Sequence, residues 1–501
     1  MASQEFTTVD CTKNMSSSGK SMQDETVIFL NLDKLVHISS SSCLDKVLEQ
    51  INKLHFVGIG GVGMSAIAEV MLDKGFEVSG SDLSDSAVVQ KLRKKGATIY
   101  KGHDAKNVEG KQAIVLSSAI HQDNPELVAA KAQNLKIFHR SDILAYLLNA
   151  AKGIAVAGAH GKTTTSSMIS VVLEHAGVDP TIVIGGFVDY LKGNAKLGKS
   201  EYLVAEADES DGSFLKFYPQ ISVVTNIEDD HMDHYGSMEN IIKAFIQFIQ
   251  NLDKETGLAV LCFDNENIRN IANKVDRNYV SYALDHEADY MATNIVTDGP
   301  KTSFDVIYKG ENLGNVCLNI PGKHNVLNAL ATIVVCHKMG LSIETIAQGF
   351  AAFSGTKRRF QTKYRQNDIW IVDDYAHHPT EIQTTIKAAK QTNPKRLIVA
   401  FQPHRYSRTK LLRQEFGACF KGADILVLTD IYAASEEPIK GITGKTIVDE
   451  VKKQTGVDAV YIENLADIAP WLQKNCQAGD LIITMGAGNI YTVGETLAQN
   501  L

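Results

Sequence analysis

The stretch IAVAGAHGKTTTSSMISVVLEHAG, residues 154–177, decides the fold expected of this chain. It opens with four apolar residues, continues through a turn with two glycines, and then carries apolar side chains at helical spacing, at Met168, Ile169, Val172, Leu173 and Ala176. A strand, a glycine-bearing loop and a helix in this order place backbone N–H groups and a helix N-terminus around a phosphate group. The stretch therefore predicts an α/β domain with a phosphate-binding loop.

The loop itself predicts how a nucleotide would be held. Lys162 would reach the terminal phosphates, and the Thr163 hydroxyl would be available to Mg²⁺. The spacing is GxxGKT and not the commoner GxxxxGKT. The alternative interpretation is a glycine turn followed by a chance Lys-Thr pair, which the flanking strand and helix disfavour. We expect ATP to contact the whole segment, which comprises Gly158, Ala159, His160, Gly161, Lys162, Thr163 and Thr164.

Two further strands end in polar side chains that suit a metal-bound nucleotide. YLVAEAD delivers Glu206 and Asp208 after an apolar run, and ISVVTN leads into IEDDHMDH, which contains His231. Parallel sheets place ligands at the carboxyl ends of their strands, and carboxylate oxygens suit Mg²⁺. A lone histidine after a strand is usually structural, but its convergence with the phosphate loop favours a catalytic role for His231.

Composition bounds the class of protein. The chain has 501 residues, 44% of them hydrophobic, which is more than one core usually absorbs. A formal net charge of −8 argues against a nucleic-acid backbone or an anionic membrane as the main partner. The seven cysteines form no CxxC pair or zinc-type spacing, so a disulfide framework and a structural metal are disfavoured. No signal peptide or membrane anchor is visible, and we expect a cytoplasmic location.

Three blocks of short apolar runs, glycine-bearing turns and helical stretches follow one another from Leu54 onward. This arrangement predicts an α/β protein with a Rossmann-like N-terminal domain (51–150), a central P-loop ATPase-like domain (151–353) and a Rossmann-like C-terminal α/β domain (354–501). Residues 1–50 show no sustained periodicity, and we expect them to form a variable, poorly ordered extension.

The first block carries a second glycine pattern. GxGxxG falls at Gly58, Gly60 and Gly63, after a strand and at the start of a helix, and Asp82 follows the next strand. Taken alone, this is the fingerprint of a dinucleotide site and favours a nicotinamide-dependent dehydrogenase. That interpretation leaves GAHGKT without a role. A glycine turn for helix packing is the structural alternative.

Several long motifs, in their order along the chain, resemble the Mur ligase family. They are GAHGKTTT, EADESD, TNIEDDHMDHY, GKHNVLNALA from Gly322, GTKRRFQ from Gly355, DDYAHHPTEI from Asp373 and FQPHRYSRT from Phe401. The resemblance covers about residue 54 to the end and implies a three-domain, ATP-dependent amide-bond ligase. HMDHYGS and GIGGVGMSAIA are most similar to the family member that adds L-alanine to UDP-N-acetylmuramate.

The resemblance implies a role for residues in all three blocks. ATP phosphates would contact Lys162, Thr163 and, from the junction with the third domain, Arg359, while Mg²⁺ would be ligated by Thr163, Glu206 and His231. The adenine would face His324, Asn325 and Asn328. UDP, in place of NAD, would be held by Gly58, Gly60, Gly61, Gly63, Ser81 and Asp82. The amino acid and the product would contact Tyr375, His377, Arg405 and Arg408.

The residue types fit the chemistry that the resemblance implies. Transfer of the γ-phosphate to the sugar carboxylate would give an acyl phosphate, with Lys162 and Mg²⁺ offsetting the developing charge. Two nearby arginines can clamp the alanine carboxylate. The alanine amine must lose a proton, and His377 or Asp374 is the predicted base. Because the substrates are spread over three domains, we expect the third domain to close before chemistry.

Several alternatives stay open. A non-catalytic nucleotide sensor would keep both glycine loops but would not need Glu206, His231 or Arg405. Within the family, the closest alternative is a ligase that recycles murein peptides by joining a tripeptide to the same sugar. Several Mur ligases have a carbamylated lysine, which is not expected here. Ile246 occupies the corresponding place, and the nearest lysine, Lys243, lies a few residues away. We expect a monomer or a homodimer.

Overall fold

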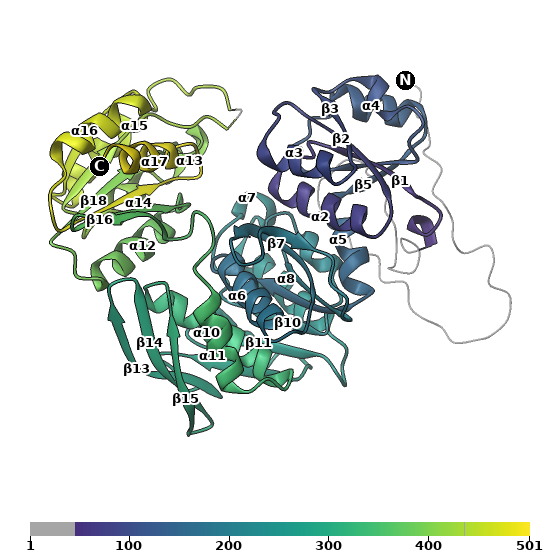
Figure 1. The fold of residues 1–501 in the computed structure, drawn as a ribbon, viewed down its shortest axis with the longest axis horizontal. Helices are drawn as coiled ribbons and strands as arrows, with labels where there is room; N and C mark the ends of the chain where they lie inside the picture. The colour runs from purple at the N-terminus through teal and green to yellow at the C-terminus, as the bar shows by residue number, and fades with distance from the viewer. Residues whose placement is uncertain (1–45, 435) are drawn as a thin grey trace.

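The computed structural model describes residues 46–434 and 436–501, which form three α/β domains, each with a sheet of its own. Figure 1 shows the first and third domains as two lobes on opposite sides of the central one. The predicted fold class is confirmed. Most of the predicted N-terminal extension lies outside the described residues, and the domain limits given above stay predictions.

The first domain is a five-stranded parallel sheet with flanking helices. Its strands are β1 (Lys53–Val57), β2 (Glu77–Asp82), β3 (Thr98–Lys101), β4 (Ala113–Leu116) and β5 (Lys136–His139), and its helices are α2 (Val62–Asp73), α3 (Ala87–Lys94), α4 (Pro125–Ala132) and α5 (Arg140–Asn149). The strand order is β3-β2-β1-β4-β5. The order therefore changes direction beside β1, which is where open α/β sheets bind ligands.

The central domain contains a ten-stranded mixed sheet. Its strands are β6 (Lys152–Ala157), β7 (Thr181–Val188), β8 (Gly193–Lys196), β9 (Tyr202–Glu206), β10 (Ile221–Val224), β11 (Leu258–Cys262), β12 (Tyr279–Ala283), β13 (Tyr290–Asp298), β14 (Lys301–Tyr308) and β15 (Glu311–Leu318). Strand β6 lies between β10 and β9 and runs parallel to both, so the ends of these three strands meet at one edge. The helices are α6 (Lys162–His175), α7 (Met232–Tyr235), α8 (Met238–Gln250), α9 (Glu266–Ala272), α10 (Lys323–Lys338) and α11 (Ile343–Ala352).

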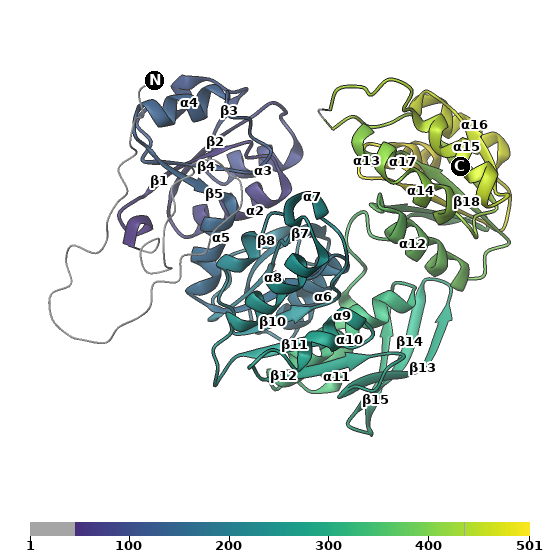
Figure 2. The ribbon, with the colours of Figure 1, turned by 180° about the vertical axis from the view of Figure 1, so that it is seen from behind.

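The third domain has a six-stranded sheet. Its strands are β16 (Gln361–Gln366), β17 (Ile369–Asp374), β18 (Arg396–Phe401), β19 (Ile425–Leu428), β20 (Asp458–Tyr461) and β21 (Asp480–Met485), in the order β16-β17-β21-β18-β19-β20. Its helices are α12 (Pro379–Gln391), α13 (Tyr406–Leu411), α14 (Arg413–Cys419), α15 (Gly444–Gln454), α16 (Ile468–Asn475) and α17 (Tyr491–Asn500). Helix α12 faces the central domain (Figure 2). Both tryptophans of the chain, Trp370 on β17 and Trp471 on α16, belong to this domain.

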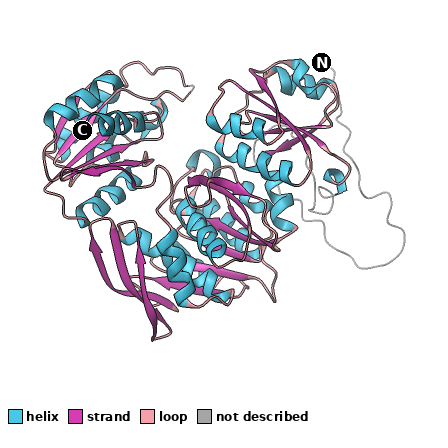
Figure 3. Ribbon diagram, in the orientation of Figure 1, coloured by secondary structure: helices cyan, strands magenta, loops and turns pink. Residues whose placement is uncertain are grey.

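Antiparallel strands join the parallel ones at three places in the second and third sheets. Strand β8 runs antiparallel to β7, β14 to both β13 and β15, and β16 to β17. Strands β13, β14 and β15 are separated only by residues 299–300 and 309–310. A two-residue connection can join only antiparallel strands, because parallel strands need a much longer crossover. Buried and less buried residues alternate along β14, as expected of a sheet with one exposed face. Figure 3 shows these hairpins projecting from the central domain.

The apolar core of the third domain is separate from that of the other two. One continuous cluster of buried side chains runs from Leu48 to Phe353. The third domain has clusters of its own, and the adjacent residues Ile371 and Val372 belong to different ones. Successive side chains of a strand point to opposite faces, so these clusters cover the two faces of one sheet. In the described part of the chain, no helix is long and apolar enough to cross a membrane.

Candidate active site

The phosphate loop lies between β6 and α6, as predicted. The φ angle is +133° at Gly158 and +86° at Gly161, a region that residues with a Cβ rarely adopt. A Cβ at Gly161 would also lie 2.6 Å from Asn328 Oδ1 on α10. The Thr225 hydroxyl donates to the His160 carbonyl oxygen at 2.6 Å and ties the loop to the end of β10. The glycines, α10 and β10 thus hold the loop in one shape.

The Lys162 ammonium group is held inside this loop. Its Nζ donates to the Gly158 carbonyl oxygen at 2.6 Å and to Glu209 Oε1 at 2.7 Å. Glu209 is only 3% exposed. Burial lowers the pKa of Lys162, but Glu209 outweighs that effect and raises the pKa above its usual value, so the group stays charged. The sequence indicated a run of carboxylates here but did not single out Glu209 as the partner of Lys162.

The three predicted magnesium ligands lie beside the loop but do not form a closed cluster. The Thr163 hydroxyl donates to Glu206 Oε2 at 3.1 Å. His231 has a φ of +61°, and its Nε2 lies 3.7 Å from Glu209 Oε1. Among residues 46–434 and 436–501, no group of three or more His, Cys, Asp and Glu side chains has the spacing of a metal site. The paired oxygens of Thr163 and Glu206 fit an ion such as Mg²⁺, which takes most of its ligands from water and phosphate.

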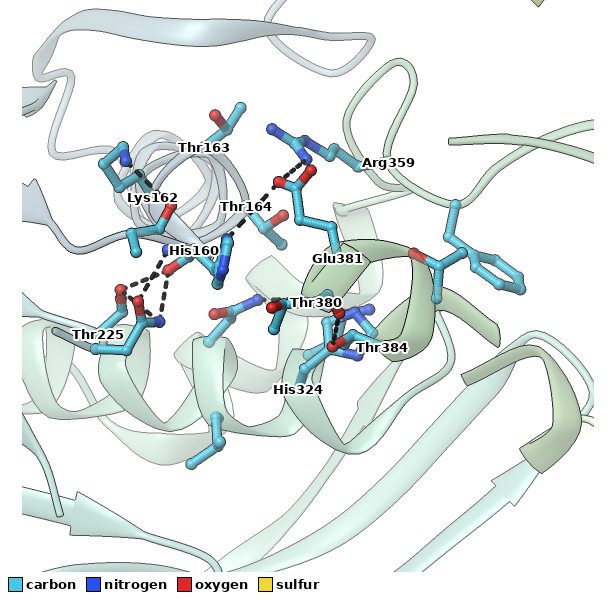
Figure 4. A pocket seen from close by; sticks show the side chains of 18 of the residues that line it. His160, Lys162, Thr163, Thr164, Thr225, His324, Arg359, Thr380, Glu381 and Thr384 are labelled. Atoms are coloured by element: carbon cyan, nitrogen blue, oxygen red, sulfur yellow. Dashed lines mark hydrogen bonds and ion pairs between the residues drawn. The ribbon is translucent and has the colours of Figure 1, made fainter. Parts of the chain in front are cut away.

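A cavity of about 260 Å³ extends from the loop to the third domain. Figure 4 shows the loop residues on one side, His324 of α10 below, and Thr380, Glu381 and Thr384 of α12 opposite. Arg359 reaches the same space from the junction, so both domains form the walls. Burial, assisted by the Arg359 charge, lowers the pKa of His324 to about 4, which leaves the imidazole neutral at pH 7.

The other predicted adenine contacts, Asn325 and Asn328, also line this cavity. Both side chains are engaged within the protein. Asn325 Nδ2 donates to the Pro321 carbonyl oxygen at 2.7 Å, and Asn328 Oδ1 accepts from the Thr165 hydroxyl at 3.2 Å. The two asparagines therefore connect α10 to its preceding turn and to α6.

His160, in the middle of the loop, is surrounded by carboxylates. Its Nε2 lies 3.2 Å from Glu228 Oε2 and 3.9 Å from Asp230 Oδ2, and its Nδ1 lies 3.7 Å from Glu381 Oε1 of the third domain. Burial lowers the pKa of His160, but Glu228 and Glu381 outweigh it and raise the pKa to about 10. A charged His160 thus bridges the central and third domains. The sequence reasoning missed this cluster, whose members are far apart along the chain.

Asp374 and Tyr375 lie at the end of β17, next to the cavity. Asp374 is 6% exposed, and its carboxylate accepts from the backbone N–H of Phe360 at 2.7 Å and of Ala376 at 2.8 Å. Burial raises the pKa of Asp374 to about 6. The Tyr375 ring stacks against the Arg359 guanidinium, 5.4 Å from the ring centre. The predicted base Asp374 thus has both oxygens engaged in shaping the turn.

His377, Arg405 and Arg408 come together at the start of α12 and α13. Burial lowers the pKa of His377 to about 4, with Arg408 contributing and Glu381 opposing. Burial and the neighbouring Arg405 lower the pKa of Arg408. Arg408 Nη1 is buried and has no hydrogen-bond partner among the described residues, which leaves a donor for an anionic ligand. His404, which the sequence reasoning did not select, packs 5.8 Å from the His377 ring.

The glycine pattern of the first domain surrounds the end of β1. Gly58 has a φ of +74°, and the Gly60 N–H donates to Asp82 Oδ2 at 2.9 Å. A Cβ at Gly60 would lie 2.7 Å from that oxygen. Gly61 is the cap of α2, and a Cβ at Gly63 would approach Arg140. Asp82 therefore closes the loop that the sequence assigned to a nucleotide.

Ser81 belongs to a buried polar cluster beneath this loop. Its hydroxyl donates to Glu126 Oε2 at 2.6 Å, and both residues are 0% exposed. Asn107 Nδ2 donates to Glu126 Oε1 at 2.6 Å, while His103 Nδ1 and His55 Nε2 lie 3.1 and 3.5 Å from the same carboxylate. The Ser81 side chain is therefore buried within the domain, where it contacts the Glu126 carboxylate, and its role toward a nucleotide stays a prediction.

Three family models match the chain in succession. They are described as the Mur ligase family, catalytic domain (residues 53–152), the Mur ligase middle domain (156–336) and the Mur ligase, glutamate ligase domain (358–488). Two similar curated proteins are UDP-N-acetylmuramate–L-alanine ligases. That of Trichlorobacter lovleyi is 49% identical over 90% of this chain and 99% of its own, and that of Geotalea uraniireducens is 50% identical over 90% and 98%.

Solved structures of two ligases are also similar. The UDP-N-acetylmuramate–alanine ligase of Thermotoga maritima matches with a TM-score of 0.76 and 30% identity over 89% of this chain and 98% of its own. A murein peptide ligase from Psychrobacter arcticus matches with a TM-score of 0.67 and 25% identity over the same shares of the two chains. Both similarities extend over all three domains.

Proposed function

The chain belongs to the Mur ligase family, and we propose that it is the ATP-dependent ligase that adds L-alanine to UDP-N-acetylmuramate in peptidoglycan precursor synthesis. The observation that carries this proposal is sequence identity. Proteins named for that activity share about one residue in two with this chain over nearly their full length. Among the similar solved structures, the alanine ligase has the higher TM-score, 0.76 against 0.67 for the murein peptide ligase, which favours alanine over a tripeptide as the acceptor.

The first step activates the lactyl carboxylate of the sugar. A carboxylate is a poor electrophile, so the γ-phosphate of ATP is transferred to it, which gives ADP and an acyl phosphate. Lys162 and Arg359 lie on the walls of the cavity that joins the loop to the third domain and would offset charge on the phosphoryl oxygens. Thr163, Glu206 and His231 would hold Mg²⁺, which supplies further neutralisation of phosphate charge when bound.

The second step forms the amide. The alanine amine attacks the acyl carbonyl carbon, the carbonyl–phosphate bond breaks in the resulting tetrahedral intermediate, and inorganic phosphate leaves. Arg405 and Arg408 would hold the alanine carboxylate, and the unpaired Nη1 of Arg408 supports this role. The Tyr375 ring packs against the Arg359 guanidinium, and Tyr375 also interacts electrostatically with Arg408.

His377 is the better candidate for the base. Its low pKa keeps it neutral at physiological pH, so a ring nitrogen is free to accept a proton from the amine. Asp374 instead accepts two backbone N–H groups and is nearly enclosed. Asp374 would therefore act by shaping the turn that presents His377.

The nucleotide part of the sugar substrate would bind in the first domain. The loop of Gly58, Gly60, Gly61 and Gly63 lets a pyrophosphate approach the backbone at the start of α2. Asp82 holds this loop closed through the Gly60 N–H. If ATP binds at the second glycine loop and the UDP sugar at the first, both loops have a ligand. A dehydrogenase would use only the first loop.

Phosphate release tests the proposal. We expect release to require ATP, UDP-N-acetylmuramate and L-alanine together, and to be slower with serine or glycine. A reaction lacking the sugar is the control, because a simple ATPase would still release phosphate. Preference for the L-alanyl-γ-D-glutamyl-meso-diaminopimelate tripeptide would contradict the assignment, and binding of ATP without any release would indicate a sensor.

A further inference from the structure

Glu381, on the first turn of α12, has contacts on two sides. Its Oε2 accepts from the backbone N–H of His377 at 3.1 Å and of His378 at 3.3 Å. Its Oε1 lies 3.7 Å from both His160 Nδ1 and Arg359 Nη1, as the dashed lines in Figure 4 indicate. Burial raises the pKa of Glu381, but His160, His377 and Arg359 outweigh it and hold the pKa well below its usual range. The side chain is therefore a carboxylate anchored between the phosphate loop and His377.

Two acceptors lie next to the Nδ1 atom of His377 in the described part of the chain. It lies 3.1 Å from the Tyr375 carbonyl oxygen and 3.3 Å from Glu381 Oε2. A neutral imidazole carries one proton, and the nitrogen that faces acceptors must carry it. Nε2 then holds the lone pair. The same relation between a carboxylate and a histidine orients the general base in serine hydrolases.

We propose that Glu381 is a positioning residue for amide formation, which holds the Nδ1 proton of His377 and so leaves Nε2 to accept the proton of the amino group. This rests on the proposed function, because it takes His377 as the base. The proton passes from the alanine nitrogen to Nε2 as the new C–N bond forms.

Positive charges on other elements lower the basicity of His377, and Glu381 opposes them. Arg408 of α13 and Arg359 of the junction disfavour a protonated His377, and so does burial. The His404 and Tyr375 rings pack against the imidazole at 5.8 and 5.4 Å. Glu381 is the carboxylate in contact with the ring that favours its protonation. Removing the negative charge should lower the basicity of Nε2 further.

The Glu381→Gln variant removes the negative charge and keeps the size of the side chain. An amide oxygen can still accept from the His377 and His378 N–H groups at the start of α12, so the helix end should persist. The Glu344→Gln variant makes the same change on the first turn of α11, at an exposed site, and serves as the matched control. Glu344→Gln should unfold like the unmodified protein, whereas Glu381→Gln should unfold at a lower temperature because it loses its ion pairs with His160 and Arg359. Activities are therefore compared at a temperature where circular dichroism shows both variants folded.

Nitrogen NMR of ¹⁵N-histidine-labelled protein reads the tautomer without any substrate. We expect His377, assigned by its loss in His377→Gln, to carry its proton on Nδ1 at neutral pH and to resist protonation to a lower pH in Glu381→Gln. A proton on Nε2 in the unmodified protein would overturn the inference, whether or not the variants fold. This measurement is independent of alanine, so it can succeed even if the proposed substrate is wrong.

Steady-state phosphate release completes the test. We expect kcat of Glu381→Gln to fall about 100-fold, the lower end of what a general acid or base contributes, without a rise in the KM for ATP. Glu344→Gln should keep the kcat of the unmodified protein. A Glu381→Gln variant with kcat within twofold of the unmodified protein, or with a loss expressed only in KM, would overturn the positioning role.

Discussion

Replacing the buried Glu126 by glutamine should destabilise the first domain in a pH-dependent manner. The substitution keeps the shape of the side chain and removes the charge that Ser81, Asn107 and His103 surround. Burial raises the pKa of Glu126, but its contacts with His55, Ser81 and Asn107 outweigh it and lower the pKa from 4.5 to about 2.

The size of the effect follows from this change in proton affinity. A fall from 4.5 to about 2 corresponds to about 3 kcal/mol of folding free energy, since each tenfold change is worth about 1.4 kcal/mol. A carboxylate with a lowered pKa stabilises the folded state fully above its unfolded pKa and loses the effect as the pH falls through the folded pKa. The contribution is therefore complete at pH 7, less than half as large at about pH 3, and absent below about pH 2.

Hydrogen exchange measures this locally. The free energy of opening of amides in β1 and β2 should be about 3 kcal/mol lower in Glu126→Gln at neutral pH, with most of the difference gone at pH 3. Glu77→Gln, which removes only an exposed ion pair with Lys53, is the control and should change stability by less than about 1 kcal/mol. Equal destabilisation by Glu126→Gln at both pH values would refute the reasoning.

Three other substitutions test the active site. Lys162→Ala should abolish phosphate release while leaving UDP-sugar binding by calorimetry largely intact, and loss of both would mean that the two nucleotide sites are misplaced. His160→Gln should lower the unfolding temperature most at or below pH 6.5, because a group whose pKa is raised to about 10 stabilises the fold below its ordinary pKa and loses that effect as the pH rises toward 10. A pH-independent difference would contradict a charged bridge. Arg408→Ala should raise the KM for L-alanine at least about tenfold, through loss of a charged hydrogen bond, and should leave the KM for ATP unchanged. An equal rise in both constants would argue against a carboxylate clamp.

Local patterns made the phosphate loop predictable. The glycines at 158 and 161 have positive φ angles and are packed against neighbouring elements, so their spacing directly reflects the loop geometry. Glu206 is the last residue of β9, which ends at the same edge of the sheet, and its carboxylate accepts a hydrogen bond from Thr163 there. Sequence and structure agree at these positions because each depends on only one strand, one turn and one helix.

Contacts between distant segments could not be predicted in this way. Glu381 approaches His160 only because α12 of the third domain faces the phosphate loop, and no sequence period relates the two residues. The resemblance placed Ser81 near the nucleotide, and that role stays a prediction, whereas its buried contact with Glu126 joins distant segments and could not be predicted. Asp374 was selected for its chemical type, whereas its burial and its two backbone partners emerge only from the folded turn.

The location of both tryptophans gives the third domain an optical signal of its own. Trp370 lies on β17, where Arg365 covers its ring at 4.7 Å and Phe360, the residue after Arg359, packs at 5.8 Å. Trp471 lies on α16 of the same domain. Excitation at wavelengths that select indole therefore records the surroundings of this domain alone, without a label. A change of emission on adding ATP would report events at the junction, while the first two domains contribute only tyrosine fluorescence.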